Sequence, residues 1–271
     1  MVEIRCNEMS LAQICGSGQC FRMYPVSDGW FELIAGDRFL RVGQDGEKIL
    51  FDCDRSAFDS FWRDYFDLDT DYAAFIERIN PNDRYLLAAA EYGWGMRILK
   101  QDLWEVIVSF LISQQNHIKR IRRCIDQICI RYGKKCINER GETYFAFPEP
   151  RALALEDEDA LKACNLGYRS KYVVRTARMV AEGRLDLDRI KTMPYHRAKK
   201  ALLDCSGIGE KVADCICLFG LHHLQAFPVD THIRQALDAH YKRGFPNRRY
   251  RDCRGAIQQY IFYYELDHAG R

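Results

Sequence analysis

A lysine and a later aspartate are the residues of this sequence best placed to do chemistry. Lys211 follows the tight turn 206–209 in the first turn of a predicted helix, and Asp230 directly precedes another predicted helix. A neutral lysine amine attacks electrophilic carbons, and a nearby carboxylate stabilises positive charge that develops on such a carbon. The simpler interpretations are that Asp230 only caps its helix and that Lys211 forms a surface ion pair with Asp214.

The turn before Lys211 predicts a site for an anion. It carries glycines at 207 and 209, and it joins two predicted helices into a hairpin at about 197–220. Glycine allows the backbone to approach a partner closely, and the free N–H groups at the start of the second helix suit a phosphate. The alternative is a pair of helices that packs only against its own core, which a Gly-x-Gly turn alone would favour.

The elements that position these residues change along the chain. Alternating apolar residues and turn residues predict strands over 30–36, 38–44 and 47–53, and a helical period begins near Ala57. The sequence therefore predicts an α+β protein in which a small N-terminal antiparallel β-sheet domain with flanking helices (1–90) precedes an all-helical body (91–271). Helices are expected at 71–79, 83–91, 103–114, 117–132, 157–163, 169–181, 195–205, 209–220, 231–242 and 250–264.

Charge is distributed unevenly between these two parts. The chain has a net charge of +2, but residues 1–90 hold 9 Lys and Arg against 16 Asp and Glu, so the remainder carries the basic excess. Segment 118–135 contains seven basic residues and one acidic residue around an apolar stripe at helical spacing. This pattern indicates a helix that contacts phosphates, or more simply an amphipathic helix with a solvated face.

The twelve cysteines are expected to be free thiols in a reducing compartment. We find no secretory leader and no apolar stretch long enough to cross a bilayer. No pair of cysteines has C-x-x-C spacing, and no group of four lies near the C-terminus, so we expect neither an iron–sulfur cluster nor a structural zinc ion.

Several motifs together resemble one family. The string LLDCSGIGEKVADCICL (202–218), followed by PVDTH (228–232), is similar to the 8-oxoguanine DNA glycosylase/AP lyase family, within the helix–hairpin–helix glycosylases that have a Gly/Pro-rich loop and a later aspartate. The elements GQCFR (18–22), SQQNHI (113–118) and LGYR (166–169) also resemble elements of that family. The chain departs from the family pattern at Ser206, which replaces a frequent proline, and at Gln115, which replaces an asparagine.

The resemblance implies a role for each matching residue. Lys211 would attack the sugar C1′ and form a Schiff base that permits β-elimination, and Asp230 would stabilise the sugar cation. The remaining roles are the pocket for a flipped base (Gly18, Cys215, Gln258 and Phe262), the opposite base and the wedge (Gln115, Arg120, Tyr168 and Arg169), and the DNA phosphates (Asn116, Gly207, Gly209, Val212 and His232).

The resemblance also implies a partner and a setting. The partner would be double-stranded DNA that contains 8-oxoguanine, bound by a monomer without a membrane, inside a cell and in a bacterial cytoplasm. No cofactor is expected beyond a structural monovalent cation on the hairpin carbonyls. Two alternatives stay open, a bifunctional glycosylase for another oxidised base and a non-catalytic helix–hairpin–helix module that only binds DNA.

Overall fold

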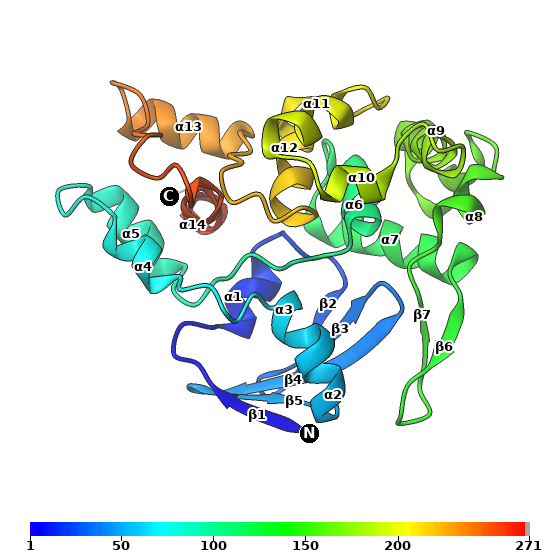
Figure 1. Ribbon diagram of the computed structural model, residues 1–271, viewed down its shortest axis with the longest axis horizontal. Coiled ribbons are helices and arrows are strands. Elements are labelled where there is room, and N and C mark those ends of the chain that lie inside the picture. Colours follow the sequence, from blue (N-terminus) through cyan, green and yellow to red (C-terminus); the bar gives the residue numbers. More distant parts are fainter. Residues whose placement is uncertain (269–271) are drawn as a thin grey trace.

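The N-terminal part of the chain forms one antiparallel sheet. The computed structural model describes residues 1–268 and places this sheet below a helical body (Figure 1). In the third strand every second residue is buried, because one face of the sheet packs on the core. The strand order is β1-β5-β4-β3-β2, with β1 (Val2–Arg5), β2 (Met23–Ser27), β3 (Trp30–Ala35), β4 (Arg38–Asp45) and β5 (Lys48–Phe51).

The three strands expected from alternation are confirmed as β3, β4 and β5. The sequence pattern missed β1, β2 and the short helix α1 (Leu11–Gly16). β1 and β2 are the two edge strands of the sheet, and β2 contains Pro25, which weakens a strand pattern, while α1 has fewer than two helical turns. The expected α+β architecture, with a small sheet followed by a helical body, is nevertheless the one observed (Figure 1).

A wide helical turn closes the core of the sheet. The helix expected from Ala57 onward is present as α2 (Arg55–Ala57), the π-helix η1 (Phe58–Trp62) and α3 (Arg63–Tyr65). Phe51 of β5 packs edge-on against Phe58 and Phe66, with ring centroids 4.9 and 5.4 Å apart. Such aromatic pairs add a specific geometry to the burial of apolar area.

The helical body follows the expected order of helices, with differences at short elements. The expected helix at 157–163 is a 3-10 helix, and the last helix begins four residues later than expected. The helices are α4 (Ala73–Glu77), α5 (Arg84–Tyr92), α6 (Leu103–Ser113), α7 (Ile118–Tyr132), α8 (Pro150–Ala154), η2 (Ala160–Cys164), η3 (Gly167–Arg169), α9 (Ser170–Ala181), α10 (Leu187–Lys191), α11 (Tyr195–Leu203), α12 (Glu210–Phe219), α13 (Thr231–His240) and α14 (Arg254–His268). The hairpin of β6 (Lys135–Ile137) and β7 (Thr143–Phe145), which the sequence did not predict, extends down beside the sheet (Figure 1).

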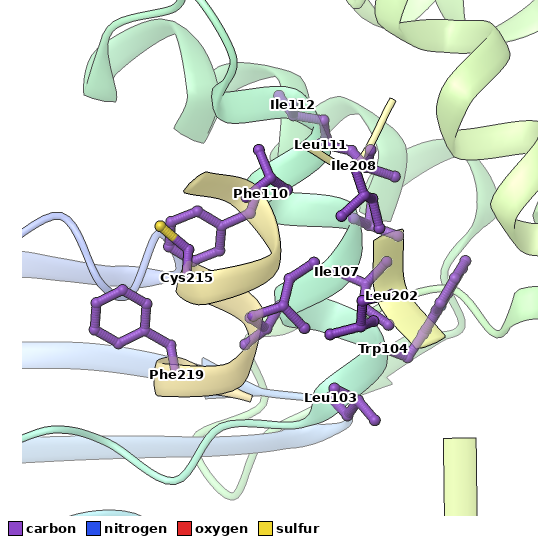
Figure 2. Close-up of a cluster of buried hydrophobic side chains, with 14 of the residues drawn as sticks. Leu103, Trp104, Ile107, Phe110, Leu111, Ile112, Leu202, Ile208, Cys215 and Phe219 are labelled. Atoms are coloured by element: carbon purple, nitrogen blue, oxygen red, sulfur yellow. The ribbon is translucent and has the colours of Figure 1, made fainter. Parts of the chain in front are cut away.

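Helix α6 forms the centre of the largest core. Ten consecutive residues of α6, 103–112, are buried, so this helix has no solvent-facing stripe. It packs against the hairpin helices α11 and α12, with Leu202 and Ile208 lying beside it (Figure 2). Packing on the buried helix α6 therefore fixes the position of the hairpin.

A third core unites helices that are far apart in the sequence. Leu86 and Ala89 of α5 are buried in one cluster with Ile233 of α13 and Ile257 of α14. The expected division at residue 90 placed α5 with the N-terminal unit, whereas its apolar face packs on the C-terminal helices. Within residues 1–268 no helix has the length and apolar character needed to cross a membrane.

Candidate active site and DNA interface

A cleft of about 1070 Å³ brings together most of the residues singled out from the sequence. Its walls come from the loop after α1, the turn between α6 and α7, the start of α12, the loop before α13, and α14. The predicted site residues that line this cleft are Gly18, Gln115, Asn116, Gly209, Lys211, Val212, Cys215, Asp230, His232, Gln258 and Phe262. Gly207, Arg120, Tyr168 and Arg169 do not line it.

The turn of the hairpin reaches the edge of this cleft at Gly209. The N–H of Ile208 donates to the carbonyl of Cys205 at 3.1 Å, and Gly209 caps α12 without a side chain. Gly207 has φ +86°, and a Cβ atom there would lie 2.5 Å from the ring of Tyr172. The turn therefore requires glycine at 207, both for its left-handed backbone and for its close approach to α9.

Lys211 projects from the first turn of α12 into the cleft. Its Nζ atom lies 5.6 Å from the centre of the Phe110 ring. Within residues 1–268 no carboxylate forms an ion pair with it, although Cys215 one turn later is a hydrogen-bonding neighbour. Burial raises the pKa of the Cys215 thiol to about 11 against the opposing effect of Lys211, so this thiol is neutral at pH 7.

The simpler interpretation of Lys211, an ion pair with Asp214, is wrong. Asp214 is buried against α11, where it accepts a hydrogen bond from Tyr195 Oη at 2.6 Å. Lys199 Nζ lies 3.0 Å from both of its carboxylate oxygens. Asp214 therefore serves the packing of α11 on α12, and the Lys211 amine is left for the cleft.

Asp230 caps α13 and faces the same cleft. Its Oδ1 accepts the backbone N–H of Ile233 at 2.9 Å, which is the N-cap geometry expected from the sequence. One carboxylate oxygen thus holds the helix, while the residue lines the cavity together with Lys211. The N-cap interpretation and the catalytic interpretation of Asp230 are compatible.

The inner end of the cleft carries a buried polar group without a partner. Gln258 of α14 is 4% exposed, and its Oε1 has no hydrogen-bond donor among the described residues. A buried acceptor without a donor costs about 1–3 kcal/mol, so such a group is typical of a site completed by a ligand. Phe262 lies one turn further along α14 and packs near Gly18, where an added Cβ would be 3.5 Å from its ring.

Hydrogen bonds from α14 and from the segment before α6 hold the loop that carries Gly18. Gln259 Nε2 donates to the carbonyl of Ser17 at 2.6 Å, and Gln19 Oε1 accepts the N–H of Leu99 at 2.9 Å. Gly18 has φ +72°, which fixes the direction of the peptide that follows it. Sequence reasoning missed Gln259, although a second glutamine beside Gln258 in an apolar helix was the available signal.

The residues predicted to contact the opposite strand lie at the outer rim. Gln115 and Arg120 are exposed, and Arg120 Nη2 donates to the carbonyl of Asn165 at 3.3 Å. Tyr168 is 45% exposed. Arg169 is buried, and its guanidinium donates to backbone carbonyls of the turn between α6 and α7.

No described group suggests a metal centre. Among residues 1–268, no three His, Cys, Asp or Glu side chains are arranged so that they could hold a metal ion. The cysteines in this part of the chain are free, and most of them are buried. His232, a predicted phosphate contact, has a buried Nδ1 without a partner in the same part of the chain.

Comparisons with known proteins agree with this architecture. Residues 1–107 match the model of the 8-oxoguanine DNA glycosylase N-terminal domain, and residues 108–249 match that of the HhH-GPD superfamily of base excision DNA repair proteins. The chain is 29% identical to the N-glycosylase/DNA lyase of Saccharomyces cerevisiae over 87% of this chain and 69% of that protein. It is 34% identical to the probable N-glycosylase/DNA lyase of Methanothermobacter thermautotrophicus over 76% and 72% of the two chains.

A solved structure gives the same result in three dimensions. The 8-oxoguanine glycosylase/lyase of Clostridium acetobutylicum, in complex with double-stranded DNA, superposes with a TM-score of 0.91 at 33% identity, covering 97% of this chain and 93% of that one. The helix–hairpin–helix, with a lysine and a carboxylate in the cleft beside it, places this chain in the HhH-GPD superfamily of base excision DNA repair proteins. Within that class, this chain belongs to the family with the 8-oxoguanine DNA glycosylase N-terminal domain.

Proposed function

We propose that this protein removes 8-oxoguanine from duplex DNA, preferably opposite cytosine, and then cleaves the strand as an AP lyase. The observation that carries the proposal is one cleft that holds the Lys211 amine, the Asp230 carboxylate and the Gln258 amide oxygen. Among residues 1–268, no carboxylate forms an ion pair with Lys211 and no donor reaches Gln258 Oε1. The relatives named N-glycosylase/DNA lyase support the same pair of activities. A module that only binds DNA needs neither the amine nor the carboxylate.

The reaction proceeds through a covalent bond to Lys211. The lone pair of its neutral Nζ attacks C1′ of the sugar, and the C1′–N9 bond breaks with its electrons passing to the base, which takes up a proton. Opening of the sugar ring and loss of a proton from nitrogen give a Schiff base. Removal of a C2′ proton then expels the 3′ phosphate by β-elimination. In the first step, Asp230 stabilises the positive charge that develops on the sugar as the C1′–N9 bond breaks.

The pocket selects the base after it leaves the stack. The base must rotate out of the duplex to reach Lys211. The carbonyl of Gly18 accepts the N7–H that 8-oxoguanine has and guanine lacks, and Gln258 binds the Watson–Crick edge. Cys215 and Phe262 lie on either side of the ring. Normal guanine would face the Gly18 carbonyl with an acceptor, an unmatched buried contact that costs about 1–3 kcal/mol.

The phosphates and the opposite strand are bound around the cleft. The backbone amides of Gly207, Gly209 and Val212 bind phosphates at the hairpin, together with Asn116 and His232. At the rim, Gln115 and Tyr168 fill the gap that the flipped base leaves. The exposed Arg120 donates to the orphaned cytosine.

The chemistry through Lys211 uses no redox or metal cofactor, and a monovalent cation on the hairpin carbonyls would be structural. We therefore expect full activity in EDTA. The protein acts as a monomer in the cellular compartment that contains the genomic DNA. A relative that matches most of this chain occurs in yeast, so such proteins are not confined to bacteria.

Borohydride trapping tests this function directly. The wild-type protein is incubated with an 8-oxoguanine:cytosine duplex and sodium borohydride, which reduces a Schiff base to a stable adduct. We expect an adduct with wild type and none with Lys211→Gln. The matched control is Lys200→Gln, an exposed lysine of the neighbouring helix, which should trap normally. Absence of a wild-type adduct, or an undiminished one with Lys211→Gln, would refute the proposal, and duplexes with other oxidised bases test the alternative substrate.

A further inference from the structure

One basic residue of α7 contacts the protein instead of solvent. Of the seven basic residues in segment 118–135, six are exposed, namely Lys119, Arg120, Arg123, Arg131, Lys134 and Lys135. Arg122 is the exception, because it is half-buried and its Nε is covered without an acceptor among residues 1–268. Its environment therefore differs from that of a surface cation that binds a DNA phosphate.

Arg122 binds the end of the helix that precedes Gly18. Its Nη2 donates to the carbonyl of Cys15 at 3.0 Å and lies 3.7 Å from the Cys15 sulfur. Cys15 is in the last turn of α1, where backbone carbonyls have no partner within the helix. An arginine from another element can supply such a partner. Gly18, which lines the cleft, follows three residues later.

The same face of α7 makes two further contacts with the chain around Gly18. Ile118, Arg122 and Asp126 are spaced by four residues and therefore share one face of the helix. A Cβ atom added to Gly18 would lie 3.6 Å from Ile118 Cδ1. Asp126 Oδ1 accepts a hydrogen bond from Tyr24 Oη at 2.5 Å. The Tyr24 ring centre also lies 5.7 Å from the Arg122 guanidinium carbon. The contacts of this face thus lie before, at and after Gly18.

We propose that Arg122 is a positioning residue that fixes the direction of the Gly18 carbonyl, and with it the discrimination between 8-oxoguanine and guanine. Gly18 has φ +72° and no side chain to restrain its backbone. Its direction therefore depends on the bonds to its neighbours. One of these reaches the carbonyl of Ser17 from α14, and another reaches the carbonyl of Cys15 from Arg122. This inference rests on the proposed function, because the carbonyl acts only when an oxidised base enters the pocket.

Two reactions of the same protein separate base recognition from the rest of the site. Excision of 8-oxoguanine needs the Gly18 carbonyl, whereas cleavage at a preformed abasic site needs Lys211 and DNA binding but no base. Arg122 itself does not line the cleft. We expect Arg122→Met to lower single-turnover excision opposite cytosine by about 10–10²-fold, because a small misplacement of a recognition group has an effect of that size. Cleavage of the abasic duplex should be unchanged. An equal loss in both reactions, or no loss of excision, overturns the proposal.

Affinity separates the positioning role from a phosphate contact. Dissociation constants are measured in a Lys211→Gln background, which cannot form the Schiff base, for duplexes that differ only in 8-oxoguanine or guanine. Arg122→Met should weaken binding of the 8-oxoguanine duplex by about tenfold and leave that of the guanine duplex unchanged. Loss of a phosphate contact would instead weaken both duplexes alike and reduce the salt slope by about 1, and that result overturns the proposal.

Arg123→Met is the matched control. It removes the same charge from the next residue of α7, whose side chain is exposed. The ratio of the excision rate to the abasic cleavage rate should stay at the wild-type value in this variant. A fall in that ratio as large as with Arg122→Met would show that the charge on α7 matters and not the bond to Cys15, and it would overturn the proposal. Calorimetry establishes that each variant folds, and Arg122→Gln provides the same comparison if Arg122→Met does not.

Hydrogen exchange of the free protein tests the positioning role without DNA. Amides 16–20 should exchange faster in Arg122→Met than in wild type, while those of α12 keep their protection. Unchanged exchange at 16–20 overturns the inference. A wild-type protein that excises no 8-oxoguanine refutes the proposed function instead, and the exchange result still decides whether Arg122 holds the loop.

Discussion

Asp230 has two roles in the structure, and two substitutions can separate them. Its Oδ1 caps α13 through the N–H of Ile233 at 2.9 Å, and the residue faces the cleft beside Lys211. Asp230→Asn keeps an N-capping oxygen and removes the charge, whereas Asp230→Ala removes both. Loss of an N-cap costs about 1 kcal/mol. In a chain of this size, that lowers the melting temperature by about 2–4 °C.

The excision rate should depend on the negative charge at residue 230, and the melting temperature should depend on its capping oxygen. If the carboxylate stabilises positive charge on the sugar, both variants lose about 10²–10³-fold in single-turnover excision of 8-oxoguanine. Only Asp230→Ala should melt earlier in calorimetry, because asparagine caps about as well as aspartate. Assays at a temperature well below both transitions keep the two effects apart.

One result would refute this reasoning. An Asp230→Asn variant with the wild-type rate would show that the residue is a helix cap and nothing more. The neutral cleft would then have to stabilise the sugar in another way. The same conclusion would follow if the excision rates of Asp230→Asn and Asp230→Ala fell only in proportion to their loss of stability.

Three further outcomes follow from local geometry. Gly207→Ala should lower the free energy of unfolding by about 2 kcal/mol and weaken DNA binding in titrations, because its Cβ would lie 2.5 Å from the Tyr172 ring at φ +86°. Native Cys215 should resist iodoacetamide at pH 8 in peptide mass spectra, since burial raises its pKa to about 11; labelling as fast as that of an exposed thiol contradicts this. Burial opposes ionisation of Asp67, yet its hydrogen bonds, led by the one from His222, lower its pKa to about 2. Its stabilisation is complete above about pH 4 and is lost as the pH falls towards 2, so Asp67→Asn should flatten that part of the urea stability profile, and an unchanged slope would contradict the assignment.

The parts of the site that depend on local sequence could be predicted. The turn 206–209, Lys211 at the start of a helix and Asp230 as an N-cap each rest on a few adjacent residues, and all three are where the sequence put them. Strands β3 to β5 were visible for the same reason, because alternation within one strand reports which face is buried.

The parts that depend on tertiary packing could not be predicted. The position of Arg169 in the sequence says nothing of the carbonyls around its guanidinium, which donates to the backbone of the turn between α6 and α7 in the folded chain. Asp214 is three residues from Lys211 and was a plausible partner until α11 supplied Lys199. Helix α5 has an apolar face, but only the folded chain shows that α13 and α14 cover it.

The two ends of the cleft depend on contacts of very different sequence separation, which affects the order in which they form during folding. The hairpin that would hold phosphates closes over three residues, from Cys205 to Ile208, whereas the contact that sets the base pocket joins Ser17 to Gln259, 242 residues away. Local contacts form early and distant ones late, since the longer loop loses more entropy on closure. We therefore expect the turn of the hairpin to form earlier in folding than the base pocket.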